Sequence, residues 1–185
     1  MLYGKYTKNG TLETSVPFFL LSFPGSELPG LSIRFSNDVI IGVEFSTSKT
    51  ADAKRNPSAD KNAFARKIAA EFHQYFLSPE HIFSLPCKLE QGTLFQQKVW
   101  QALIQIPAGQ VKTYGQLAGE LNSSPRAVGN ACRKNPFPVI VPCHRVVSAS
   151  GIGGYAGDTL MTQKGTINFM QIKQWLLAHE KAKTE

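Results

Sequence analysis

The chain of 185 residues is poor in cysteine and has no long apolar run. Its three cysteines, Cys87, Cys132 and Cys143, are odd in number and widely spaced, so neither a disulfide framework nor a zinc-ligand pattern is indicated. Free thiols are typical of a reducing compartment, and we expect a cytoplasmic protein. No segment approaches the roughly 20 apolar residues of a membrane span. The N-terminus lacks the features of a signal peptide, so we expect no membrane partner.

Acidic side chains are missing altogether between Asn122 and Gly157, in a chain whose formal net charge is +7. A stretch that carries only positive charges is suited to contacts with phosphates. The composition therefore favours a polyanionic partner, although basic proteins without one are common. The basic side chains that fall close to the candidate active segment are Arg126, Arg133, Lys134 and Arg145, with Lys112 alongside.

The N-terminal half shows strand patterns followed by a helix pattern. The predicted strands are Phe18–Leu21, Leu31–Phe35 and Val39–Phe45, with Asn37-Asp38 as a turn between the last two. From Asp60 onwards, apolar residues recur at helical spacing, which predicts an amphipathic helix that covers the sheet. This pattern indicates an α/β (α+β) fold class.

The C-terminal half is expected to be mainly helical. Proline and glycine between 78 and 92 indicate a linker, so we predict one domain over residues 1–88 and a second over 92–181. The second domain begins with a helix over Thr93–Leu103. Two short helices follow, Thr113–Leu121 and Arg126–Lys134.

The link between these two short helices is a tight polar turn at Asn122-Ser123. Ser124 supplies an N-cap and Pro125 a first helical residue for the second helix. Two short helices joined in this way are typical of a helix-turn-helix, in which small residues let the second helix approach DNA. An ordinary helical hairpin fits the same pattern.

The segment Pro142-Cys143-His144-Arg145-Val146 places a thiol beside a base and a cation. A neighbouring His or Arg lowers a thiol pKa and so favours the reactive thiolate. The apolar run over 138–141 predicts a strand that delivers Cys143 to the rim of a pocket, and the glycine-rich segment 150–155 predicts a loop. A buried core cysteine and a cysteine hydrolase are alternatives.

Six sequence blocks occur in order over residues 92–180. They are Phe95 to Gly109, Thr113-Tyr114-Gly115-Gln116-Leu117-Ala118, Arg126-Ala127-Val128-Gly129, Asn135-Pro136-Phe137-Pro138, Val141-Pro142-Cys143-His144-Arg145-Val146-Val147, and Trp175 to Glu180. In this combination the chain resembles the O6-alkylguanine-DNA alkyltransferases, also called methylated-DNA–protein-cysteine methyltransferases. The resemblance implies a ribonuclease-H-like N-terminal domain and a winged-helix-like C-terminal domain.

The resemblance implies direct transfer of an alkyl group from guanine O6, and from O4-alkylthymine, to Cys143 without a cofactor. The thioether product is stable, so each molecule would act once. His144 would take the Cys143 proton through a water, and Glu180 would orient the imidazole. Tyr114 would donate a proton to guanine N3, and Asn135 would brace the turn that carries the cysteine.

The implied partner is double-stranded DNA containing O6-alkylguanine, bound by a monomer through the minor groove. The target nucleotide must leave the base stack, and Arg126 would fill the space that it leaves. The resemblance also implies further contacts to DNA and a set of pocket residues. The DNA contacts are Tyr114, Ser123, Ala127, Gly129 and Arg133, and the pocket residues are Pro138, Val146, Ser148, Tyr155, Ala156 and Gly157.

The chain departs from the family pattern at several positions. Cys132 stands where a larger apolar residue is common, either as a packed core thiol or as a second alkylation site. Ala156 replaces a frequent serine. Residues 158–172 form an insertion that brings the shape of the pocket rim into question. The N-terminal cysteines that bind zinc in some members are missing, so we expect no metal. A lesion-binding relative without a reactive cysteine is a further alternative, against which Cys143 argues directly.

Overall fold

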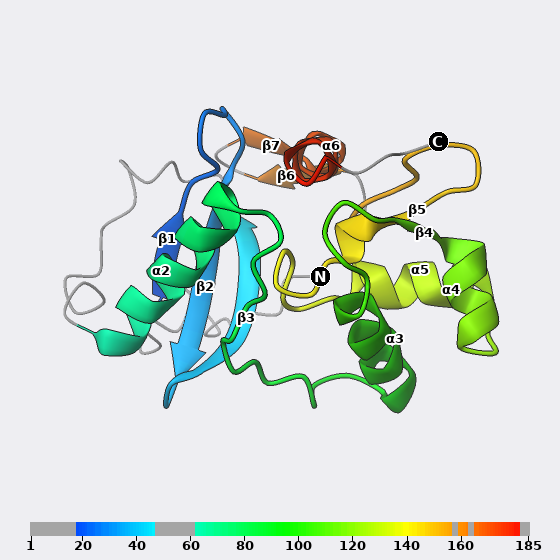
Figure 1. Ribbon diagram of the computed structural model, residues 1–185, viewed down its shortest axis with the longest axis horizontal. Helices are drawn as coiled ribbons and strands as arrows, with labels where there is room; N and C mark the ends of the chain where they lie inside the picture. The colour runs from blue at the N-terminus through cyan, green and yellow to red at the C-terminus, as the bar shows by residue number, and fades with distance from the viewer. Residues whose placement is uncertain (1–17, 47–61, 157–158, 163–164, 182–185) are drawn as a thin grey trace.

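The computed structural model describes residues 18–46, 62–156, 159–162 and 165–181. In Figure 1 a sheet with one helix packed against it lies on the left, and a group of short helices lies on the right. The last helix, α6 (Phe169–His179), lies between the two groups. Small sheets and helices together confirm a mixed α and β fold, and among the described residues no helix is long and apolar enough to cross a membrane.

The N-terminal sheet is antiparallel, in the order β1 (Phe18–Leu21), β2 (Gly30–Ser36) and β3 (Val39–Ser46). Asn37 and Asp38 link β2 to β3 with φ values of 51° and 57°. Two left-handed residues in a row form the kind of tight hairpin turn whose twist matches that of the strands. The three predicted strands and the turn are confirmed.

Helix α2 (Ala63–Leu77) presents its apolar side to this sheet. Asn62 caps it, because its side-chain oxygen accepts hydrogen bonds from the backbone N–H groups of Phe64 and Ala65. The buried residues of the helix include Ile68, Phe72 and Tyr75. The predicted helix is confirmed from Ala63 onwards, and Asp60, its expected start, lies outside the described residues.

The predicted linker over 78–92 is held along the edge of the sheet. The Ile40 N–H donates to the Pro86 carbonyl at 2.8 Å, and the Lys88 N–H donates to the Ile40 carbonyl at 3.0 Å. Cys87 therefore pairs with Ile40 as a short parallel bridge beside β3. This pairing ties the beginning of the helical half to the sheet.

The helical half contains α3 (Leu94–Ile104), α4 (Tyr114–Glu120) and α5 (Pro125–Arg133). Thr93 and Thr113 each form a capping box with a glutamine three residues on, and Ser124 caps α5. The indole N–H of Trp100 donates to the Ala131 carbonyl at 3.0 Å and so fixes α3 against α5. The three predicted helices are confirmed.

A short parallel pair, β4 (Lys112–Thr113) with β5 (Val146–Val147), brings two distant segments together. Thr113 lies opposite Val147 in this pair. Because α4 starts directly after β4, Tyr114 stands beside the loop that follows Val147. This placement joins the start of the two-helix unit to the segment that carries Cys143.

The insertion over 158–172 contains an antiparallel hairpin, β6 (Thr159–Thr162) with β7 (Gly165–Asn168), and then the first turn of α6. Ile167 and Phe169 are buried. The Phe169 ring lies 5.6 Å from that of Phe45 on β3. At its C-terminal end the insertion therefore packs against the N-terminal sheet.

Candidate active site

The segment that precedes Cys143 is a tight turn, so the predicted strand over 138–141 is wrong. The Val141 N–H donates to the Phe137 carbonyl at 2.8 Å, which closes the turn. Val139 has a φ of 76°, and such a conformation costs a β-branched residue about 1–3 kcal/mol. Cys143 then begins a 3-10 helix, η1 (Cys143–Arg145), and it is 5% exposed.

Asn135 holds this turn through both ends of its side-chain amide. The NH2 group donates to the Val141 carbonyl at 2.7 Å and to the Cys143 sulfur at 3.1 Å. The amide oxygen accepts from the Phe137 N–H at 2.9 Å. One side chain therefore offsets the strain at Val139 and touches the thiol directly.

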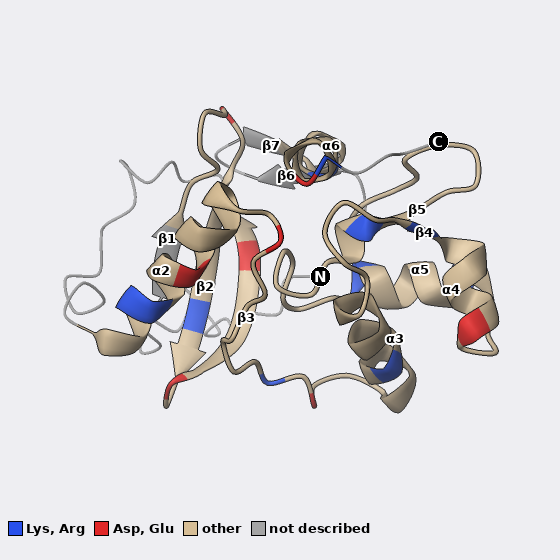
Figure 2. Cartoon of the chain, in the orientation of Figure 1, with Lys and Arg blue, Asp and Glu red and all other residues tan. Residues whose placement is uncertain are grey.

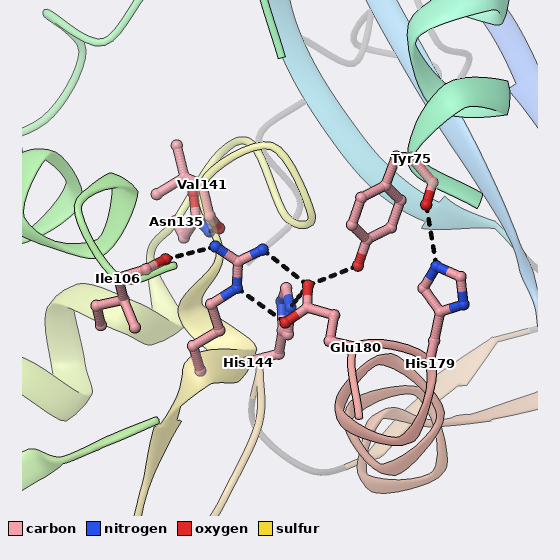
Figure 3. A network of polar contacts seen from close by, with 8 residues as sticks. Tyr75, Ile106, Asn135, Val141, His144, His179 and Glu180 are labelled. Atoms are coloured by element: carbon pink, nitrogen blue, oxygen red, sulfur yellow. Dashed lines mark hydrogen bonds and ion pairs between the residues drawn. The ribbon is translucent and has the colours of Figure 1, made fainter. Parts of the chain in front are cut away.

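Glu180, which follows α6, is the centre of a buried polar network (Figure 3). Its Oε1 accepts from His144 Nε2 at 2.9 Å, from Arg145 Nη2 at 2.8 Å and from the Tyr75 hydroxyl at 2.8 Å. Its Oε2 accepts from Arg145 Nε at 2.9 Å. Burial alone would raise the pKa of Glu180, but the hydrogen bonds and charges of His144 and Arg145 hold that pKa well below its usual value.

Burial favours the neutral forms of both the Cys143 thiol and the His144 imidazole. Burial raises the pKa of the Cys143 thiol, against which the Asn135 hydrogen bond and the Lys173 charge act. Burial lowers the pKa of His144, while the hydrogen bond and charge of Glu180 raise it. Nδ1 of His144 is buried and has no hydrogen-bond partner among the described residues. When Nε2 donates to Glu180, the other ring nitrogen, Nδ1, is therefore available to accept a proton.

Lys173 is a residue beside the site that the sequence analysis did not single out. Its side chain is fully buried in α6, and its ammonium donates to the carbonyls of Val146 at 2.7 Å, Ile152 at 2.7 Å and Gly154 at 3.1 Å. The same ammonium lies 5.8 Å from the centre of the Tyr114 ring. Lys173 therefore fixes the loop after η1 and places a positive charge near the thiol. A lysine on the apolar side of an amphipathic helix is the signal that could have found it.

A hollow of about 360 Å³ opens over Cys143. Its walls come from the start of α4, from α5, from η1 and from the loop after β5. The hydroxyl of Tyr114 donates to the Gly154 carbonyl at 3.1 Å, which ties the tyrosine to the loop after β5. The lining residues are Tyr114, Pro125, Gly129, Cys132, Arg133, Cys143, Gly154, Tyr155 and Ala156.

The predicted pocket residues divide into three groups. Tyr155 and Ala156 line the hollow. Pro138, Val146 and Ser148 do not belong to its lining, and Gly157 lies outside the described residues. Tyr155 is 4% exposed, its ring lies 6.1 Å from that of Phe45, and its hydroxyl faces the thiol of Cys143.

The predicted DNA-contact residues lie on α5 and on the turn that precedes it, except Tyr114, which begins α4. Arg126 and Arg133 are exposed, whereas Ser123, Ala127 and Gly129 are half-buried. Gly129 faces the Tyr114 ring, whose nearest atom would be 3.9 Å from a Cβ at that position. Figure 2 shows basic positions on α3, α5 and η1, with one acidic position at the end of α4.

Two of the basic residues close to the candidate active segment have an acidic partner. Arg145 is held in the network by Glu180 and by the Ile106 carbonyl, and its side chain is 11% exposed. Its guanidinium is therefore engaged inside the protein. Lys112 pairs with Glu120 at 2.6 Å. Arg133 and Lys134 are exposed near the hollow.

Cys132 lines the same hollow as Cys143, from the last turn of α5. It is buried, and burial raises the pKa of its thiol strongly. The described residues offer it no base comparable to His144. The structure therefore presents Cys132 as a packed thiol.

Fold and site together define a mixed α/β protein in which a cysteine, a histidine and a carboxylate meet beside two short helices. A family model for the DNA-binding domain of 6-O-methylguanine DNA methyltransferase matches residues 94–182. A methylated-DNA–protein-cysteine methyltransferase from Methanosarcina mazei is 36% identical over 128 residues, covering 68% of this chain and 73% of that protein. The chain belongs to the 6-O-methylguanine DNA methyltransferase family.

Other relatives match over a smaller share of their length. The constitutive methylated-DNA–protein-cysteine methyltransferase of Bacillus subtilis is 41% identical over 105 residues, which are 55% of this chain and 63% of the relative. The Salmonella typhimurium methyltransferase is 49% identical over 92 residues, which are 48% of this chain and 47% of the relative. The chain thus spans about half to two thirds of these two proteins.

Solved structures extend the similarity to the N-terminal half. The Mycobacterium tuberculosis O6-methylguanine methyltransferase has a TM-score of 0.64 at 28% identity, covering 90% of this chain and 93% of that one. The Mycobacterium tuberculosis OGT in complex with DNA has a TM-score of 0.65 at 29% identity, covering 89% of this chain and 92% of that one. The fold of this chain is therefore that of the family over most of its length.

Proposed function

We propose that this protein repairs DNA by transferring an alkyl group from O6-alkylguanine, and from O4-alkylthymine, to the thiol of Cys143. The observation that carries the proposal is the position of Cys143 at the base of a hollow, next in sequence to a histidine that a buried carboxylate holds. The reaction needs no cofactor, because the bond that forms is between the sulfur and the alkyl carbon.

The proton of the thiol passes to Nδ1 of His144, directly or through a water, as the sulfur attacks the alkyl carbon. The bond between O6 and that carbon breaks, its electron pair stays with the base, and Tyr114 donates a proton to the base. His144 then releases the thiol proton to solvent, and Tyr114 takes a proton back from solvent. Glu180 stabilises the imidazolium through the hydrogen bond at Nε2. Sulfur is suited to this displacement since a thiolate is a soft nucleophile. The thioether has no leaving group, so each molecule acts once.

DNA is the macromolecular partner in this proposal. The helices α4 and α5 approach the minor groove, and the target nucleotide rotates out of the duplex into the hollow over Cys143. Arg126 is exposed at the start of α5 and is free to enter the space left in the stack. Arg133 and Ser123 contact the backbone, and Ala127 and Gly129 allow close approach. A repair protein must act in any sequence, and contacts to phosphates meet that need.

The proposal also includes the finer organisation of the chain. Residues 1–88 form a ribonuclease-H-like domain, and residues 92–181 form a winged-helix-like domain with the helix-turn-helix. The protein acts as a monomer in the cytoplasm. The Val43 N–H donates to the Pro136 carbonyl at 2.9 Å, and this hydrogen bond between the two parts supports a firm attachment.

The experiment that tests the proposal is a measurement of intact protein mass after incubation with duplex DNA that contains one O6-methylguanine. We expect every molecule to gain one methyl group in place of a hydrogen and then to react no further. Cys143→Ala should gain nothing, and the matched control Cys87→Ala should react as the natural chain does. An unchanged mass in the natural chain would contradict the proposal, as would full methylation of Cys143→Ala.

A further inference from the structure

We propose that the hydroxyl of Tyr75 weakens Glu180 as an acceptor for His144 and thereby keeps His144 able to take the Cys143 proton at neutral pH. The inference rests on the proposed function, and it assigns a positioning residue of the reactive group to the N-terminal half. Tyr75 lies 105 residues before Glu180 in the chain.

Tyr75 makes two hydrogen bonds with the C-terminal end of α6 and the residue that follows it. Its hydroxyl donates to Oε1 of Glu180 at 2.8 Å, and its carbonyl accepts from Nε2 of the neighbouring His179 at 3.0 Å. Tyr75 is 1% exposed, Glu180 is 4% exposed and His144 is fully buried. Water therefore has little access to the carboxylate, and the Tyr75 hydroxyl is the donor that takes its place. Figure 3 shows the hydroxyl pointing at the carboxylate from the side opposite to η1.

The chemistry follows from the sharing of one oxygen. Oε1 of Glu180 accepts from Tyr75, from His144 and from Arg145 at once. A donor bound to a carboxylate favours its charged form and spreads its negative charge, so the carboxylate attracts the proton on the imidazole less strongly. Without the Tyr75 donor, and with Arg145 still in place, the carboxylate would attract that proton more strongly, and His144 would hold it at higher pH. A protonated His144 cannot accept the proton of Cys143.

The other groups around this site also shift the pKa values of His144 and Tyr75. Burial has the largest effect and lowers the pKa of His144, the Glu180 contact raises it, and the charges of Arg145 and Lys173 lower it. Glu180 in turn raises the pKa of Tyr75, after the larger effect of burial, so Tyr75 stays a donor. Among the described residues, the titratable or charged groups around Cys143, His144 and Glu180 are Tyr75 from α2, Tyr114 from α4, Cys132 and Arg133 from α5, Arg145 from η1, Tyr155 from the following loop, and Lys173 and His179 from α6.

The test is the pH dependence of methyl transfer from the free O6-methylguanine base to the full chain and to Tyr75→Phe. The phenylalanine keeps the ring and removes only the hydroxyl. We expect the acidic limb of the rate profile to move upward by about one pH unit in Tyr75→Phe. The imidazole signals of His144, assigned with His144→Gln, should titrate at a correspondingly higher pH by NMR.

The control is Phe76→Leu, on the same helix. The centre of the Phe76 ring lies 6.0 Å from that of Trp175 and 6.2 Å from that of His179. This change therefore disturbs packing without removing a donor to Glu180. It should lower stability and leave the acidic limb in place. An unmoved limb and an unmoved His144 titration in Tyr75→Phe would overturn the inference, as would equal shifts in both variants. If the natural chain transfers no methyl group, the proposed function fails, while the NMR titration still decides the role of Tyr75.

Discussion

Replacing Lys173 by methionine should destabilise the protein far more than the loss of an ordinary lysine. Methionine keeps much of the apolar stem and removes the ammonium with its hydrogen bonds to three carbonyls. The Val146 carbonyl lies in a buried contact, where an unsatisfied acceptor costs about 1–3 kcal/mol. The carbonyls of Ile152 and Gly154 are partly exposed and can turn to water, so we assign about 0.5–1 kcal/mol to each.

The expected loss in the free energy of unfolding is therefore about 2–4 kcal/mol, since removal of a buried charge offsets part of the sum. For a chain of this size that loss corresponds to a melting temperature lower by about 5–15 °C. The measurement is urea unfolding of Lys173→Met beside Lys112→Met. Lys112 pairs with Glu120 through side chains that are 36% and 49% exposed, and such a pair contributes about 0.5 kcal/mol.

The comparison between the two lysines decides the matter. If Lys173→Met unfolds within about 1 kcal/mol of Lys112→Met, the cost of burying the ammonium cancels its hydrogen bonds, and the reasoning about the loop is refuted. A second measurement uses the reactivity of the Cys143 thiol. Because the Lys173 charge lowers the pKa of Cys143, the variant should react more slowly with iodoacetamide at a fixed neutral pH.

Three further predictions concern DNA and pH. Arg133→Ala should weaken binding to all duplex sequences alike and reduce the slope of log affinity against log salt by about 0.9, as measured by titration at several salt concentrations; an unchanged slope would remove Arg133 from the phosphate contacts. Arg126→Ala should slow transfer from duplex DNA much more than transfer from free O6-methylguanine in single-turnover assays, because only the duplex requires flipping; equal losses would exclude a role in flipping. The depressed pKa of Glu180 stabilises the folded state above about pH 4.3 and less as pH falls below it, so unfolding of Glu180→Gln should depend less steeply on pH between about 5 and 3; identical slopes would contradict the network.

Local signals made most of the helices predictable. Asn62, Thr93, Thr113 and Ser124 each cap a helix with a side chain that acts within three residues, so their effect is visible in the sequence. The turn at Asn37-Asp38 is equally local. These elements form where the sequence reading expected them, because their main determinants are short-range.

The turn before Cys143 could not be read in the same way. Its residues are apolar and β-branched, which is typical of a buried strand, yet Asn135 bends them into a turn by three hydrogen bonds. The left-handed Val139 is the clearest case, since its propensity opposes its conformation. Tertiary contacts overrode the local preference here.

Long-range partners were the other part that the sequence could not supply. The pattern Cys143-His144-Arg145 indicated a reactive thiol, but the role of Arg145 depends on Glu180, 35 residues further on. Lys173 finds its carbonyls 19 to 27 residues earlier. Tyr75 reaches the site from a helix that the resemblance did not cover. Such pairings depend on the fold, and no local pattern encodes them.

The most direct test of the account is the location of the transferred group. Cys132 and Cys143 line the same hollow, and burial raises the pKa of both thiols, but His144 stands next to Cys143 alone. After reaction with duplex DNA containing O6-methylguanine, the digested protein should be examined by tandem mass spectrometry. The account predicts a single S-methylcysteine, at position 143. Methylation at Cys132 with Cys143 unmodified would contradict it.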